Sequence, residues 1–198
     1  MRRTDPEKHQ QRRQEILDAA GRCFARDGFC GASISDICAE AKISPGHLYH
    51  YFDSKEAVVK SMTEATLAKA EAEFELMSQS DDPIAEITAR AERARVKQGD
   101  SAYFLVFDML AEAGHNPSIA RILRDHMQAL RSRMAAYLRK GQENGKIDRS
   151  LDADLAAAVL LSAFDGIRAI GVRDPKLSKG RLGEHVEILI TRFLRPNR

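Results

Sequence analysis

Apolar side chains recur at the spacing of an α-helix along almost the whole chain of 198 residues. In the first such stretch, Ile16, Leu17, Ala20, Cys23 and Phe24 lie about one or two helical turns apart and share one face. No stretch alternates apolar and polar residues over six positions, and no Asn-Gly or Asp-Gly pair lies between two such stretches. With 43% hydrophobic residues, the chain can form a core. The sequence therefore predicts an all-α protein of about nine helices.

Residues 33–52 contain two short amphipathic helices, joined by Lys42 and Ile43 and preceded by a longer helix. Ser33 with Asp36 is a start signal of the capping-box kind for the first helix. Ser44 followed by Pro45 starts the second helix. Three helices with this spacing are typical of a helix-turn-helix module, which binds DNA. Asp53 with Glu56 then predicts the start of a long fourth helix.

The second short helix, Ser44 to Tyr51, has an outer side that suits nucleic-acid binding. Its inward residues are Leu48 and Phe52. Its outward residues are Gly46, His47, Tyr49 and His50. Histidine and tyrosine side chains can donate hydrogen bonds to phosphates or base edges, and a small residue lets the backbone approach closely.

Lys55 is unusual because it lies in the first turn of the fourth helix, where an acidic residue suits the helix dipole better. A bound phosphate would explain a lysine at this position. The alternative is that Lys55 is a solvated surface residue.

These residues resemble the DNA-binding module of TetR-family transcriptional regulators. The positions that match the family pattern are Gly28, Phe29, Ser33, Ile37, Ser44, Gly46, Leu48, Tyr49, Tyr51, Phe52, Lys55 and Glu56. The resemblance implies a recognition helix at Ser44–Tyr51, with Ser33 and Lys55 on phosphates and Gly46 and His47 near base edges. The residues expected to contact DNA are Ser33, Ser44, Pro45, Gly46, His47, Tyr49, His50 and Lys55.

Two positions depart from the family pattern. Cys38 stands where the family usually has alanine, which is a mild change. Lys42 stands where the turn usually has glycine, and a left-handed backbone at a lysine costs roughly 1 kcal/mol.

The charge of the module is divided along the chain. Residues 1–14 contain five basic and two acidic residues, whereas residues 15–56 contain four basic and seven acidic residues. One hypothesis is that the basic N-terminal tail lies on the DNA backbone or in the minor groove. The alternative is a disordered tail that only aids solubility.

The rest of the chain resembles the TetR family in helix number and order alone. We expect a DNA-binding domain at residues 1–55 and a ligand-binding and dimerisation domain at residues 56–198. Residues 102–113 are apolar nearly all round their predicted helix, which implies burial on several sides. The predicted small-molecule pocket is lined by Phe104, Phe107, Asp108, Met127 and Phe164. The alternatives are that Asp108 faces solvent and that the aromatic and methionine side chains belong to an ordinary core.

The last two predicted helices carry apolar stripes that suit pairing with a second copy. A single helix-turn-helix offers few base contacts, so such modules work as symmetric pairs. The residues expected at a four-helix dimer interface are Leu160, Phe164, Ile167, Val186, Leu189, Ile190 and Phe193. The alternative is that both stripes form the core of one chain.

Other chemistry has no support in the sequence. Three cysteines without a Cys-x-x-Cys pair, and histidines without ligand spacing, predict neither a disulfide framework nor a metal site. We expect no cofactor and no catalytic residue, because no nucleophile or phosphate-binding motif is present. Cys30 alone among the cysteines is a candidate redox switch, and small buried hydrophobes are the alternative for all three. Without a secretory signal or a membrane-spanning run, we expect a cytoplasmic protein.

Together these features predict a ligand-responsive bacterial transcriptional regulator. We expect a repressor that binds a palindromic DNA operator as a homodimer and is released by a small molecule. Two other classes stay open. A helical enzyme would turn over its bound molecule and lack specific DNA affinity, and a helical interaction module would use its first three helices to bind a protein.

Overall fold

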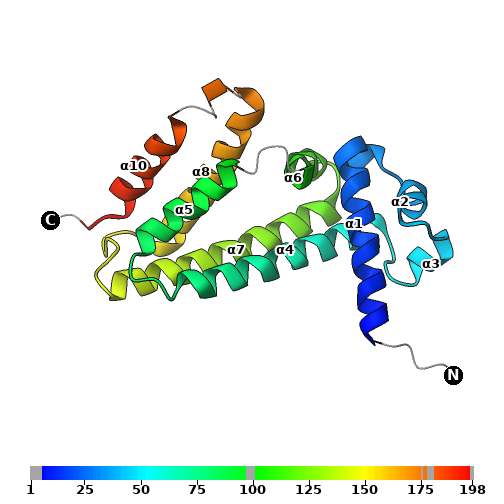
Figure 1. The fold of residues 1–198 in the computed structure, drawn as a ribbon, viewed down its shortest axis with the longest axis horizontal. Helices are drawn as coiled ribbons and strands as arrows, with labels where there is room; N and C mark the ends of the chain where they lie inside the picture. Colours follow the sequence, from blue (N-terminus) through cyan, green and yellow to red (C-terminus); the bar gives the residue numbers. More distant parts are fainter. Residues whose placement is uncertain (1–5, 97–100, 175, 178–180, 197–198) are drawn as a thin grey trace. The chain divides into compact units, whose positions relative to one another are not determined.

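The computed structural model describes residues 6–96, 101–174, 176–177 and 181–196, and this part of the chain is helical without any strand (Figure 1). The prediction of an all-α fold is therefore confirmed. The helices are α1 (Pro6–Gly31), α2 (Ile34–Ala41), α3 (Pro45–Tyr49), α4 (Lys55–Met77), α5 (Pro83–Val96), α6 (Ser101–Glu112), α7 (Pro117–Glu143), α8 (Ala153–Arg173) and α10 (Leu182–Leu194).

Polar side chains begin several of these helices by accepting hydrogen bonds from unpaired backbone amides. The Asp82 carboxylate accepts bonds from the amides of Ile84 and Ala85 at the start of α5, at 3.1 and 3.0 Å. Asn116 does the same for the first turn of α7. Beyond the end of α7, Gly145 has a φ of 67°, which a residue without Cβ adopts at little cost.

The start of α4 differs from the prediction. The Ser54 hydroxyl, not the Asp53 carboxylate, accepts a bond from the Ala57 amide at 3.2 Å. The expected Asp-x-x-Glu start is therefore one residue out of register, because the adjacent serine offers an equally good acceptor.

The chain forms two compact units, each with its own hydrophobic core. Unit 1 comprises residues 1–66 and 99–126, and unit 2 comprises residues 67–98 and 127–198. Helices α4 and α7 contribute residues to both units. The functional boundary expected between residues 55 and 56 concerns DNA binding and ligand binding, and it stays a prediction.

Unit 1 is built around α1, which packs against α2 and α6. Its core includes Ile16 and Phe24 from α1, Ile37 from α2 and Leu48 from α3. Helix α1 is broken near its end, where Gly28 has φ 72° and ψ 171°. This break turns the chain toward α2.

In unit 2, α5 packs against both α8 and α10 (Figure 1). Buried apolar side chains from these helices and from α7, including Ile87, Leu138 and Ile190, form its core. The Tyr137 hydroxyl lies in this core and donates to the Met77 carbonyl at 3.4 Å. Burial raises the pKa of Tyr137 to about 12.

Candidate nucleic-acid interface

Helix α3 is held to unit 1 by one side and leaves the other side open. Leu48 is 0% exposed, and Phe52 is buried just beyond the helix. The opposite side carries the exposed residues Ser44, Pro45, Gly46, His47, Tyr49 and His50, with Tyr49 52% exposed. The predicted division between inward and outward residues therefore matches the observed burial.

The start of α3 and the turn before it are fixed by local hydrogen bonds. The Ser44 hydroxyl accepts a bond from the His47 amide at 3.2 Å. In the turn, Lys42 has the left-handed conformation, with φ 54° and ψ 47°, and the Ile43 amide donates to the Cys38 carbonyl at 3.0 Å. The departure from glycine at position 42 thus leaves the turn geometry intact at an energetic cost.

Gly46 has no packing reason to be glycine. A Cβ built on this residue would meet no atom of the chain within 4 Å. The open space beside Gly46 is therefore available to a molecule outside the chain.

The hydroxyl and the amide of Ser33 already form hydrogen bonds with Asp36 in the first turn of α2. Its hydroxyl and its amide both donate to one Asp36 carboxylate oxygen, at 2.6 and 2.8 Å, and its hydroxyl accepts the Asp36 amide. These bonds from Ser33 lower the pKa of Asp36. The predicted phosphate contact of Ser33 remains a prediction, and a phosphate would have to replace Asp36 as the acceptor.

Lys55 has a structural explanation that neither sequence interpretation contained. Its ammonium group donates to the carbonyls of Phe29 and Ala32, at 2.8 and 3.0 Å, and lies 4.3 Å from the centre of the Phe29 ring. Lys55 is thus poorly placed for the dipole of α4 but well placed for the carbonyl groups at the end of α1. It is not merely a solvated side chain.

The acidic residues of the module are partly neutralised by ion pairs within α1 and between α1 and α2. Arg22 contacts Glu40 at 2.6 Å, and Arg26 lies 2.8 Å from Asp27 and 3.7 Å from Glu40. Mainly because of its hydrogen bond with Arg22, the pKa of Glu40 is lowered. These pairs lie at the exposed junction of the two helices, where each contributes little to stability.

The beginning of α1 also reaches α3, which no sequence pattern indicated. The ring centres of His9 and Tyr51 are 4.6 Å apart. The Arg13 guanidinium lies 5.0 Å from the centre of the Phe52 ring and donates to the Ser61 hydroxyl. A single histidine in a charged segment carries no periodic signal, so tertiary packing alone brings His9 to this position.

The three cysteines have different environments. Cys23 and Cys38 are buried, and burial raises the pKa of each thiol. Cys30 is exposed, and its thiol donates to the Glu112 carboxylate at 3.0 Å. This hydrogen bond raises the pKa of Cys30, which disfavours the reactive thiolate.

The residues predicted to line a ligand pocket belong to both units. Phe107 is 37% exposed and Asp108 is half-buried in unit 1, where the Asp108 carboxylate lies against Gly28. In unit 2, Phe164 is buried and Met127 is exposed. The side chain of Phe104 lies outside the described part of the structure. The ligand role of these residues stays a prediction.

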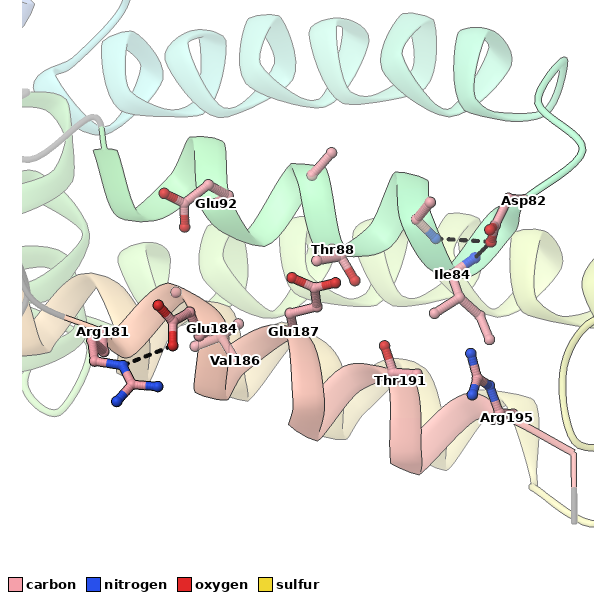
Figure 2. Close-up of a pocket in the computed structure, with 13 residues that line it drawn as sticks. Asp82, Ile84, Thr88, Glu92, Arg181, Glu184, Val186, Glu187, Thr191 and Arg195 are labelled. Atoms are coloured by element: carbon pink, nitrogen blue, oxygen red, sulfur yellow. Dashed lines mark hydrogen bonds and ion pairs between the residues drawn. The ribbon is translucent and has the colours of Figure 1, made fainter.

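Unit 2 has a groove of about 690 Å³ between α5 and α10, and none of the predicted pocket residues lines it (Figure 2). Thr88 and Glu187 lie on facing sides of this groove, and Arg181 forms an ion pair of 2.8 Å with Glu184 at one end. The groove is therefore polar along much of its length.

Burial divides the residues predicted for the dimer interface. Leu189 is 58% exposed and Phe193 is half-buried. The others are covered within one chain, as the alternative of an ordinary core requires: Leu160, Phe164, Ile167, Val186 and Ile190. Two further residues of the apolar stripe on α8 are exposed, Leu155 at 68% and Val159 at 53%. The apolar stripe of α8 does not by itself show which side faces outward.

Two further findings concern the described residues alone. None of the helices in this part of the chain has the length and apolar character needed to cross a membrane. Across the same ranges, no group of three or more His, Cys, Asp or Glu side chains is arranged to hold a metal ion.

Helices α2 and α3 form a helix-turn-helix whose second helix is exposed on its outer side. This arrangement is typical of DNA-binding transcriptional regulators. Two family models match the chain: "Bacterial regulatory proteins, tetR family" over residues 16–62, and "BetI-type transcriptional repressor, C-terminal" over residues 90–195. The chain belongs to the TetR family of bacterial transcriptional regulators.

Individual relatives agree with this family. The regulator UidR of Escherichia coli K12 is 30% identical over 161 residues, which cover 79% of this chain and 80% of UidR. The A-factor receptor protein of Streptomyces griseus is 27% identical over 81% of this chain and 55% of its own length. The solved structure of GusR from Salmonella enterica has a TM-score of 0.84 at 25% identity, covering 98% of this chain and 99% of GusR.

Proposed function

We propose that this regulator is a repressor that binds a palindromic DNA site as a homodimer through α3 and is released by a small molecule. The observation that carries the proposal is the two-sided character of α3. Leu48 is buried and holds the helix to unit 1. Residues 44–47, 49 and 50 are exposed. The B-DNA major groove is about 12 Å wide and admits such a helix.

Several residues of this surface suit contacts to DNA. The imidazoles of His47 and His50 and the phenol of Tyr49 are exposed donors. The missing side chain of Gly46 allows the backbone to approach the duplex. Lys55 uses two of its three ammonium hydrogens on carbonyl groups, which leaves one for a phosphate.

Exposed apolar residues of unit 2 support pairing with a second copy. Leu155 and Val159 on α8, and Ile188 and Leu189 on α10, are all exposed. Leu155 and Val159 are four residues apart and therefore neighbours on one face of α8. Exposed apolar side chains that adjoin each other mark interaction sites. A twofold pair presents two α3 helices to half-sites about 34–36 Å apart.

An effector that binds one arrangement of this pair better than another would change DNA affinity by the same factor that DNA changes effector affinity. The groove between α5 and α10 has a volume within the usual range of small-molecule sites, which supports ligand binding in unit 2. None of the residues predicted from the sequence lines this groove, so an effector contact of Phe104, Phe107, Asp108, Met127 or Phe164 is a separate proposal for each residue.

The test is a mobility-shift titration of the full chain at 150 mM KCl. The probe is duplex DNA from upstream of the chain's own gene, with a random duplex as competitor. We expect binding at least about 10³-fold tighter to the specific duplex. Binding to neither duplex at any salt concentration would contradict the proposal and favour an interaction module. Turnover of a bound molecule without specific DNA affinity would favour an enzyme.

A further inference from the structure

Three imidazole rings surround the Tyr51 ring where the first turns of α1 approach the end of α3. The ring centres of His9, His50 and His47 lie 4.6, 5.2 and 5.5 Å from that of Tyr51. The His9 ring is tilted by 33° against Tyr51, and the His50 ring meets it edge-on at 86°. The centres of His9 and His50 are 6.1 Å apart. The Tyr51 ring therefore lies beside His9 of α1, His47 of α3 and His50 at the end of α3.

This cluster is accessible and is not part of the core. His47 and His50 are exposed, whereas His9 and Tyr51 are half-buried. Phe52, the next residue after Tyr51, is buried in the core of unit 1. The imidazoles consequently lie on the surface that α3 presents, and they link this surface to the start of α1.

We propose that His9 is a further residue of the DNA interface, which positions α3 through Tyr51 and which, together with His47 and His50, takes up protons when DNA binds. The inference rests on the proposed function, because it needs phosphates to face α3. It assigns a role to a residue that lies outside the helix-turn-helix itself.

The physical basis is the titration of imidazole. Among the ionisable side-chain types present around the cluster, histidine is the one that ordinarily changes charge between pH 6 and 8. Three histidines close together can present up to three imidazolium charges to one stretch of DNA. DNA phosphates attract each of them, so the bound state favours protonation, and affinity must rise as the pH falls.

The neighbouring charged groups do not supply this pH dependence. On α1 they are Glu7, Lys8, Arg13 and Arg12, the last paired with Glu15. Past α3 they are Asp53 and, on α4, the pair formed by Lys60 and Glu64. Side chains of these types ordinarily keep their charge between pH 6 and 8.

The test measures the fluorescence anisotropy of a labelled random 30-base-pair duplex titrated with the full chain. Phosphate contacts do not depend on sequence, so a random duplex in 50 mM KCl reports them directly. Titrations at pH 6, 7 and 8 are run at constant ionic strength. We expect the affinity of the unaltered chain to rise at least fivefold from pH 8 to pH 6.

The deciding variant is His9→Phe, which keeps an aromatic ring against Tyr51 but cannot bind a proton. We expect it to leave the melting temperature unchanged and to lose at least half of the rise in affinity from pH 8 to pH 6. His115→Gln, which changes an exposed histidine between α6 and α7, is the matched control and should retain the full rise. A second variant, His9→Ala, removes the ring and should weaken binding at every pH.

Each result decides the inference. Binding that is independent of pH, or a His9→Phe variant with the full pH response, would overturn the proton-linked role of His9 and leave the proposed function standing. Unaltered affinity of His9→Ala at pH 8 would overturn its positioning role. Failure of the unaltered chain to bind any duplex would overturn the proposed function itself.

Discussion

Two residues near the helix-turn-helix hold a positive φ, and they differ in how well they suit it. Gly28 lacks a Cβ, and one added there would lie 2.9 Å from the Asp108 carboxylate, so glycine is required at this break in α1. Lys42 adopts φ 54° although it carries a Cβ, and its side chain is exposed. Among the described residues, no hydrogen bond or ion pair of this side chain offsets the cost of the positive φ. A positive φ therefore costs little conformational free energy at Gly28 and more at Lys42.

Lys42→Gly should therefore stabilise the protein. We expect the free energy of unfolding to rise by roughly 1 kcal/mol, because the turn keeps its shape and the left-handed strain disappears. For a chain of this length, the melting temperature should rise by about 2–4 °C in a calorimetric scan. Lys42→Ala is the matched control, since it removes the charge but keeps the Cβ. An equal gain in both variants would contradict the backbone explanation.

Lys55→Met should destabilise the protein. The variant keeps the length of the side chain but leaves the carbonyls of Phe29 and Ala32 without their charged donor. We expect a loss of about 1–3 kcal/mol in a urea titration. Lys60→Met, which changes an exposed lysine one and a half turns further along α4, should cost much less. Equal losses would remove the structural role argued for Lys55.

Cys30 should react slowly with an alkylating reagent. Its hydrogen bond to Glu112 raises the pKa of the thiol, so at pH 8 a smaller fraction is thiolate than in a free cysteine. Labelling with iodoacetamide, followed by mass spectrometry, should be slower than labelling of N-acetylcysteine. Glu112→Ala removes the acceptor and its charge, and should bring the rate closer to that of the free thiol. A rate above that of the reference would revive the redox interpretation of Cys30.

At the element scale, α3 is a five-residue helix whose position depends on its neighbours. A helix this short is unstable in isolation, so its geometry comes from the Ser44 bond, the buried Leu48 and the turn before it. Its outer side carries exposed residues that lie outside the buried core. Substitutions on that side should affect DNA binding more than folding.

His47→Ala tests this separation. We expect an unchanged melting temperature, because the His47 side chain is exposed. In binding assays on a set of duplexes that vary one base pair at a time, preference should relax at one position by about 1–3 kcal/mol. Gln14→Ala, an exposed change on α1, is the control and should leave the preference profile unaltered. Equal weakening on all duplexes would assign His47 to phosphates instead of bases.

At the scale of the whole molecule, the exposed apolar residues of α8 and α10 predict a dimer. The double variant Val159→Glu/Leu189→Glu places charges on side chains that are more than half exposed in one chain. The fold should therefore survive, as checked by circular dichroism, while sedimentation at 10 µM should show a monomer. Leu76→Glu changes a leucine on α4 that is even more exposed, and it should leave the dimer intact. A variant that still sediments as a dimer would exclude this surface.

The sequence alone determined the all-α class, the helix-turn-helix and the starts of both of its short helices. Capping side chains and apolar spacing act over a few residues, so the starts at Ser33 and Ser44 could be predicted without coordinates. The adjacent Ser54 shows the limit of such signals, since two possible caps next to each other cannot be told apart by pattern.

Tertiary structure decided which residues meet across the chain. The pairing of His9 with Tyr51 and the bonds from Lys55 to the end of α1 join residues more than twenty positions apart. Likewise, an apolar residue on α8 is core or surface according to the helices packed beside it, which separates Leu160 from Val159. Local patterns fix the turns of a helix, whereas burial depends on partners that the local sequence does not name.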